Sequence, residues 1–223
     1  MSIDGIDVSH NNGKPDWGKV AAAAKVFAYA KATEGFTFKD SEFAKNWAAI
    51  KHAGMKRGAY HFFHPHTLPE NQADHFCTVV GSLEPGDLPP AVDLEWTKPD
   101  PDEWPKVPAA DRVGLVLRFL KRVEERLGMR PIIYSSKEWV HEFIPDATAL
   151  AAYGLWVADF KSKDKPLIPP AWKQWVFWQH TDKGSVAGIK GGVDLDRFNG
   201  SPDDLANISK KAAAAPAPVE PPE

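Results

Sequence analysis

Eight short segments, most of them continuously apolar, recur along the chain, and amphipathic stretches lie between several of them. Strands that are buried on both faces of a parallel sheet have continuously apolar sequences, whereas a half-exposed strand alternates between apolar and polar residues. Strands that alternate with helices predict right-handed βαβ units and therefore an α/β fold. The eight segments are residues 3–8, 26–32, 58–63, 90–94, 131–134, 155–158, 175–178 and 193–195.

Apolar residues recur every three or four positions in three stretches, and this spacing predicts amphipathic helices. Asp40 is a candidate cap before the first helix, and Gly54 and Gly128 follow the first and the third as stop signals. Residues 159–192 are too rich in loops and tryptophan for regular helices. Eight strands with fewer than eight helices predict an irregular, TIM-like (β/α) barrel. The three stretches are 43–50, 73–80 and 113–127.

The chain of 223 residues is long enough to bury a core without disulfides. We expect one globular domain over residues 1–208, because residues 209–223 are an Ala/Pro-rich tract that predicts a tail or linker. The first residues carry no basic region followed by an apolar core, so we expect no secretory signal.

The charge balance of 27 basic and 30 acidic residues gives a net charge of −3, and no stretch is strongly basic. This argues against a nucleic-acid binder. The single cysteine, Cys77, excludes an internal disulfide and a metal site built from several cysteines. No apolar run approaches the roughly 20 residues that cross a bilayer, so we expect no membrane insertion. We also expect a monomer.

Two acidic residues, Asp93 and Glu95, lie in an apolar segment, where burying an unpaired charge would destabilise the fold. Side chains alternate along a strand, so the two acids share one face and Val92 and Leu94 share the other. If the apolar pair packs under helices, the acids point into the barrel at its carboxyl end, where barrel enzymes build their sites. About 6.5–7 Å separates such positions, so one acid becomes a proton donor while the other stays charged. The alternative is a surface strand with solvated acids.

Single acids also interrupt the first and last apolar segments, at Asp7 and Asp194. For either one alone, a turn or a helix cap is an equally good interpretation. In a closed barrel, however, the first and last strands are neighbours, so the two acids should lie side by side, with Asp93 and Glu95 roughly opposite. We therefore predict four acids around one mouth of the barrel.

Such a ring of carboxylates suits two chemistries, glycoside hydrolysis by paired acids and a site for a hard metal such as Mg²⁺ or Ca²⁺. The chain has nine tryptophans, and Trp96 directly follows the acid pair. Flat apolar rings with a polar edge suit the faces of sugars, although most tryptophans fill the core. The tryptophans favour the sugar interpretation.

The sequence resembles the glycoside hydrolase family 25 lysozymes, also called Chalaropsis-type muramidases, which include many phage lysins. The matching segments occur in order over residues 3–198. They are Gly5-Ile-Asp7-Val-Ser9, Pro15-Asp-Trp17, Lys31-Ala-Thr-Glu34-Gly35, Gly58-Ala-Tyr60-His61-Phe62, Val92-Asp93-Leu-Glu95, Pro131-Ile-Ile-Tyr134, Leu155-Trp156-Val-Ala158, Trp178-Gln179 and Val193-Asp194.

The resemblance implies a lysozyme that hydrolyses the β-1,4 bond between N-acetylmuramic acid and N-acetylglucosamine in bacterial peptidoglycan, without a cofactor or a metal. Glu95 would be the general acid and base, and Asp93 would orient the 2-acetamido group of the substrate, which attacks the anomeric carbon with net retention. Asp7 and Asp194 would shape the pocket and tune its protonation. Six further residues match positions that line the groove: Lys31, Glu34, Tyr60, Tyr134, Trp156 and Gln179.

For the groove residues, the alternative is a surface ion pair between Lys31 and Glu34 and core packing for the rest. The sequence also departs from the family pattern. Residues 9–12 read Ser-His-Asn-Asn, Phe160 stands where tyrosine is usual, and Asp196 stands where asparagine is common. None of these departures removes a match to a catalytic position.

Two other functions compete with the lysozyme interpretation. His61, His64 and His66 are spaced like metal ligands, as in a zinc-dependent polysaccharide deacetylase, although structural or solvated histidines are the favoured interpretation. A non-catalytic cell-wall-binding module is the second alternative. For a lysozyme without a secretory signal, we expect synthesis in a host cytoplasm and release as a phage endolysin.

Overall fold

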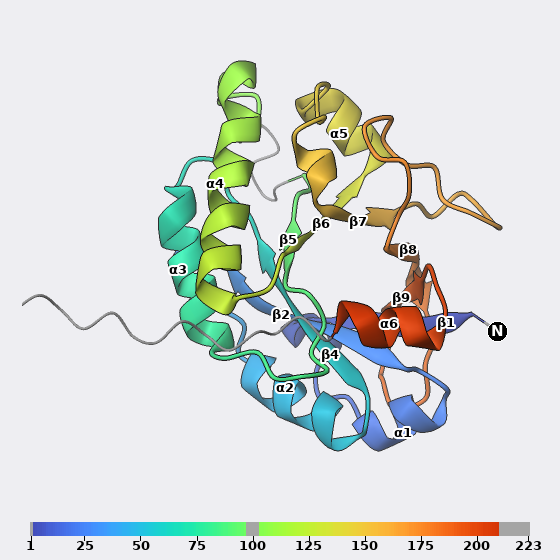
Figure 1. Cartoon of the computed structure of the whole chain (residues 1–223). Helices are drawn as coiled ribbons and strands as arrows, with labels where there is room; N and C mark the ends of the chain where they lie inside the picture. The colour runs from blue at the N-terminus through green and yellow to red at the C-terminus, as the bar shows by residue number, and fades with distance from the viewer. Residues whose placement is uncertain (1, 97–102, 210–223) are drawn as a thin grey trace, which may run out of the picture.

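In the computed structural model, which describes residues 2–96 and 103–209, eight strands close into a mixed barrel (Figure 1). Their order around the barrel is β1-β9-β8-β7-β6-β5-β4-β2, and pairing between β1 and β2 closes the ring. This is the irregular TIM-like barrel that the apolar segments predict. The strands are β1 (Ile3–Val8), β2 (Phe27–Glu34), β4 (Lys56–Phe62), β5 (Ala91–Asp93), β6 (Ile132–Ser136), β7 (Gly154–Ala158), β8 (Phe177–Gly184) and β9 (Val193–Phe198).

The expectation of parallel strands is wrong for the last strand, because β9 runs antiparallel to both of its neighbours, β8 and β1. The physical reason is the short connection over residues 185–192, since a parallel crossover needs a dozen or more residues. The strand predicted over 175–178 begins at Phe177 and continues to Gly184. The sequence also missed a two-residue strand, β3 (Phe38–Lys39), which pairs with β2 outside the barrel.

The described residues contain six α-helices, fewer than the strands, as predicted. Asp40 is not the cap of the helix predicted over residues 43–50. Glu42 takes that position, and the Asp40 carboxylate accepts a hydrogen bond from the Glu42 N–H. Gly128 ends the longest helix in a left-handed conformation at φ 66°, as its position predicts. The helices are α1 (Trp17–Ala22), α2 (Phe43–His52), α3 (Pro69–Val80), α4 (Ala109–Leu127), α5 (Lys137–Phe143) and α6 (Pro202–Ile208).

Two apolar clusters form the core. The larger lies between the outer face of the sheet and the helices and includes Val92 and Leu94 of the β5 segment. The smaller fills the interior of the barrel near the amino ends of its parallel strands, around Phe27 and Tyr29, and includes Leu205 of α6. The interior of the barrel is therefore filled at this end, so a site built inside the barrel lies at the carboxyl ends of its parallel strands.

Close approach inside the barrel explains one glycine of β4. A Cβ atom at Gly58 would overlap the ring of Tyr29, which is fully buried. The Tyr29 hydroxyl donates a hydrogen bond to the Pro89 carbonyl at 3.0 Å. Glycine is thus required here by packing rather than by the backbone angles of the strand.

Residues 159–176 contain no regular helix, as predicted, and lead from β7 to β8. The predicted Ala/Pro tail over 209–223 lies outside the described residues except for Ser209, whose carbonyl accepts a hydrogen bond from the Gly86 N–H. No helix in the described parts of the chain is both long enough and apolar enough to cross a membrane.

Candidate active site

A cavity of about 220 Å³ opens at the carboxyl ends of the parallel strands. It brings together all four predicted acids and four of the six predicted groove residues. The other two, Lys31 and Glu34, do not line it and form an ion pair with Nζ and Oε2 2.6 Å apart. The lining residues are Asp7, Tyr60, Asp93, Glu95, Tyr134, Trp156, Phe160, Gln179, Asp182 and Asp194.

The side chains of the acid pair face this cavity because side chains alternate between the two faces of the β5 segment, as predicted. Val92 and Leu94 are buried in the outer cluster, and Asp93 and Glu95 line the cavity. Asp93 is buried, so the alternative of solvated acids on a surface strand is wrong. Its Oδ1 atom has no hydrogen-bond partner among the described residues. Burial, followed by the charge of Glu95, raises the pKa of Asp93 well above its ordinary value, while the charge of Lys31 lowers it.

Asp7 and Asp194 are direct partners across β1 and β9, as barrel closure predicts. Burial raises the pKa of Asp7 well above its usual range, and the charge of Asp194 adds to this rise. Burial also raises the pKa of Asp194 to about 6. The Gln179 amide joins this pair to the other wall of the cavity, because its Nε2 donates to Asp7 at 2.7 Å and its Oε1 accepts from the Tyr134 hydroxyl at 2.7 Å.

A third buried acid, Asp196, stands behind this pair. Its Oδ1 accepts a hydrogen bond from the Trp156 indole N–H at 2.8 Å. Burial raises its pKa to about 8, and the charge of Asp194 adds to the rise. The departure of the sequence from the family pattern at this position therefore adds a group that is protonated at neutral pH.

Aromatic rings form the floor of the cavity. The buried Trp156 ring lies edge-on to Tyr134, with ring centres 5.0 Å apart, and edge-on to Tyr60 at 6.3 Å. Burial, reinforced by the carboxylates around the mouth, raises the pKa values of both tyrosines well above 10. Both hydroxyls therefore stay protonated. That of Tyr134 already donates to Gln179, so the Tyr60 hydroxyl is the one that can donate a hydrogen bond to a ligand.

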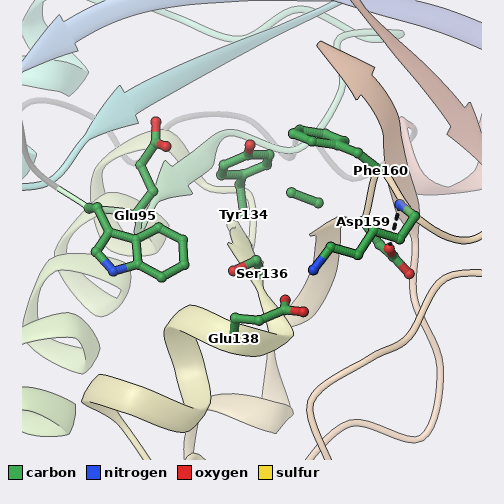
Figure 2. Close-up of a pocket in the computed structure, with 9 residues that line it drawn as sticks. Glu95, Tyr134, Ser136, Glu138, Asp159 and Phe160 are labelled. Atoms are coloured by element: carbon green, nitrogen blue, oxygen red, sulfur yellow. Dashed lines mark hydrogen bonds between the residues drawn. The ribbon is translucent and has the colours of Figure 1, made fainter.

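A second cavity of about 290 Å³ continues from the first, and the two share Glu95, Tyr134 and Phe160. Figure 2 shows the Glu95 and Tyr134 side chains pointing the same way, with Phe160 on the far side of Tyr134 from Glu95. Trp96 and Phe160 are 37% and 49% exposed here, which leaves part of each ring open to a ligand. Sequence reasoning missed four polar residues that line this cavity. They are Ser136, Glu138, Asp159 and Lys161.

The histidines that resemble metal ligands are separated by their partners. Buried His61 lies between Thr33 Oγ1 at 2.7 Å and Gln72 Oε1 at 3.1 Å, and burial lowers its pKa to about 3. His64 lies between two carboxylates, and His66 is exposed. Among residues 2–96 and 103–209, no three His, Cys, Asp or Glu side chains are grouped to hold a metal ion. The zinc deacetylase interpretation is therefore not favoured.

Comparison with known proteins agrees with this geometry. The model of Glycosyl hydrolases family 25 matches residues 6–189. The chain is 37% identical to the uncharacterized protein YegX of Escherichia coli O6:H1, over 92% of this chain and 72% of that protein. It is 33% identical to lysozyme M1 of Streptomyces globisporus, over 95% of this chain and 72% of the relative.

A solved structure, that of the bacterial lysozyme from Streptomyces coelicolor, superposes with a TM-score of 0.90 at 32% identity, covering 96% of this chain and 99% of that one. The family model spans most of the chain, and the similarity in fold covers nearly all of it. The chain belongs to glycosyl hydrolases family 25.

Proposed function

We propose that this glycoside hydrolase cleaves the β-1,4 bond between N-acetylmuramic acid and N-acetylglucosamine in bacterial peptidoglycan, with Glu95 as the general acid and base. The observation that carries the proposal is the acid pair at the barrel mouth, in which Asp93 is buried beside Glu95. The relatives named lysozyme support the substrate.

Asp93 and Glu95 are close enough for the charge of one to raise the pKa of the other, so the pair shares a proton. Buried Asp93, whose Oδ1 has no hydrogen-bond partner among the described residues, is the member that holds this proton. An acetamido N–H that donates to Asp93 favours its charged form, and the proton is then available on Glu95. Substrate binding thus prepares the donor for catalysis.

In the first step, Glu95 donates its proton to the glycosidic oxygen of the leaving N-acetylglucosamine. The acetamido carbonyl oxygen of the muramic acid residue bonds to the anomeric carbon as the bond to the leaving oxygen breaks, and an oxazolinium ion forms. In the second step, water attacks the same carbon from the opposite face while Glu95 takes a proton from it. The ring opens, and the anomeric configuration is retained. This is the substrate-assisted exception to the usual pair of carboxylates.

Asp7 and Asp194 support this chemistry from the opposite wall. The hydrogen-bond chain from Tyr134 through Gln179 to Asp7 fixes the side chains on either side of the anomeric centre. Two acids with raised pKa values carry less negative charge at mildly acidic pH than free carboxylates would. They therefore repel the charged form of Asp93 less.

The test is Glu95→Gln, which keeps the shape of the side chain and removes its proton chemistry. We expect release of reducing sugar from peptidoglycan to fall at least about 10³-fold, while sedimentation with purified walls is unchanged. Glu125→Gln, the same change on the exposed face of α4, is the matched control and should keep full activity. Reducing-sugar release by E95Q at the unsubstituted rate would refute the role of Glu95.

Two outcomes separate the competing functions. Release of acetate without new reducing ends, abolished by a chelator, would identify a metal-dependent deacetylase. Binding to walls without turnover by the unsubstituted protein would identify a binding module. For the muramidase, we expect new N-acetylmuramic acid reducing ends and no effect of EDTA.

Three expectations outside the site stay predictions. The protein is a monomer, which light scattering after gel filtration tests. It reaches the wall as a phage endolysin made in a host cytoplasm, which fractionation of infected cells tests. The Ala/Pro tract over 209–223 is a tail or linker, and removing it should leave activity on soluble wall fragments unchanged.

A further inference from the structure

His64, in the loop after β4, has a carboxylate at each of its ring nitrogens. Nε2 lies 3.0 Å from Oε1 of Glu34, and Nδ1 lies 2.9 Å and 3.1 Å from the two carboxylate oxygens of Glu103. A neutral imidazole donates a hydrogen bond from one nitrogen only, whereas the imidazolium donates from both. The two contacts together therefore require the positively charged form of His64.

The contacts continue from His64 toward the acid pair. The second carboxylate oxygen of Glu34 accepts a hydrogen bond from Lys31 Nζ at 2.6 Å. The hydrogen bond from His64 is the main cause that lowers the pKa of Glu34, to about 2, so Glu34 stays charged. The charge of Lys31 lowers the pKa of Asp93 and that of Glu34 raises it, so this row of charges acts on the buried acid.

Contacts with the rest of the protein fix the position of His64. Gln72 of α3 accepts a hydrogen bond from the His64 backbone N–H at 2.9 Å and donates one to its carbonyl at 2.8 Å. Glu103 is buried, and the His64 side chain keeps only 24% of its exposure. Neighbouring His61 contrasts with it, since burial keeps that ring neutral. The charged and titratable groups around the His64 ring are Glu34 and Lys31 of β2, Glu103, His10 and His61.

We propose that the His64 imidazolium is a positioning residue for the hydrolysis, because it holds Glu34 and, through Glu34, the Lys31 ammonium beside Asp93. The inference rests on the proposed function. When the ring loses a proton, it can donate to only one of its two carboxylates, and the row of contacts breaks. The stabilising charge beside Asp93 is then no longer held, so less of Asp93 is in the charged form that receives the acetamido group.

The direction of the pH effect follows from the contacts of His64. The hydrogen bond to Glu34 is the largest cause that raises the pKa of His64 above 6.5, and the one to Glu103 raises it further, against the effect of burial. The row of contacts from Glu103 through His64 and Glu34 to Lys31 is therefore intact in acid and at neutral pH. It is lost as the pH rises through the raised pKa of His64. A rise of one unit in the pKa of Asp93 would lower its charged fraction about tenfold, which sets the size of the effect on kcat/KM.

The test measures the His64 pKa by NMR titration of the ring and kcat/KM against pH on soluble glycan fragments, for the unsubstituted protein, E103Q and H64Q. Glu103→Gln removes a carboxylate that raises the pKa, so both the NMR titration and an alkaline limb of kcat/KM should shift about one unit lower. His64→Gln should lower kcat/KM about tenfold at acid pH and remove that limb. His66→Gln, an exposed neighbour, is the control and should change neither. Melting curves confirm that each variant is folded.

An active enzyme in which E103Q moves the NMR titration but leaves the kcat/KM profile in place would overturn this inference alone. An H64Q variant with full activity across the pH range would do the same. If the unsubstituted protein releases no reducing sugar at any pH, the proposed function falls, and the inference falls with it.

Discussion

Replacing Asp196 by asparagine should stabilise the folded protein, and more so as the pH rises. Asp196 is fully buried behind Asp7 and Asp194, and its pKa is about 8 against an ordinary value of 3.8. Between these two values the folded protein holds a proton that the unfolded chain has released. The free energy of unfolding therefore falls as the pH rises from about 4 to 8.

The magnitude follows from the width of this window. Between pH 5 and pH 8, the folded protein keeps this proton while the unfolded chain has released it. Each of these three pH units lowers the free energy of unfolding by about 1.4 kcal/mol, so this carboxyl lowers it by about 4 kcal/mol at most. Asparagine keeps the acceptor for the Trp156 indole and has no carboxyl proton to lose. Because Asp7 and Asp194 still titrate beside it, we expect the variant to recover about 2–3 kcal/mol of this loss.

The assay is urea unfolding followed by tryptophan fluorescence at pH 5 and pH 8. The stability gained by D196N should be about 2–3 kcal/mol larger at pH 8 than at pH 5. Asp164→Asn, in the exposed loop between β7 and β8, provides the matched control and should shift neither curve. A D196N variant whose stability falls with pH as steeply as that of the unsubstituted protein would refute the buried, protonated acid.

Two further predictions concern the core and the second cavity. Asp87→Ala leaves the Arg57 guanidinium, which is 6% exposed and bound to Asp87 at 2.7 Å, without its main buried partner. We expect a loss of about 3 kcal/mol in the free energy of unfolding, and a loss below 1 kcal/mol in urea titrations would contradict this account. Trp96→Ala removes a half-exposed ring from the wall shared with Glu95, so KM for glycan fragments should rise about tenfold with kcat within twofold. An unchanged KM would show that the ring does not contact substrate.

The acids were predictable from sequence because their surroundings are local. Val92 and Leu94 flank Asp93 so tightly that alternation alone sends the acid to the opposite face. The pairing of Asp7 with Asp194 needed one further assumption, closure of the barrel, since the two lie at opposite ends of the chain. Both predictions depend on the two-residue period of a strand and on the topology of a closed barrel. The pattern of apolar segments in the sequence indicates both.

The second cavity was not predictable in this way. Ser136 is the last residue of β6, Glu138 lies in the first turn of α5, and Asp159 and Lys161 lie in the loop after β7, where no apolar period marks which side chains face inward. Their position at or just past the carboxyl end of a strand was the available signal. The charge state of His64 was also hidden, because it depends on two carboxylates 30 and 39 residues away in sequence.

The reversed last strand is what completes the site. In a parallel strand, the carboxyl end reaches the mouth of the barrel, as Asp93 does at the end of β5. Asp194 is instead the second residue of β9, so in a parallel strand it would lie at the closed end, near the cluster around Phe27. Because β9 runs antiparallel to β1, its beginning lies at the mouth, and Asp194 meets Asp7 there. The connection over residues 185–192 is too short for a crossover helix, and this shortness brings the fourth carboxylate to the site.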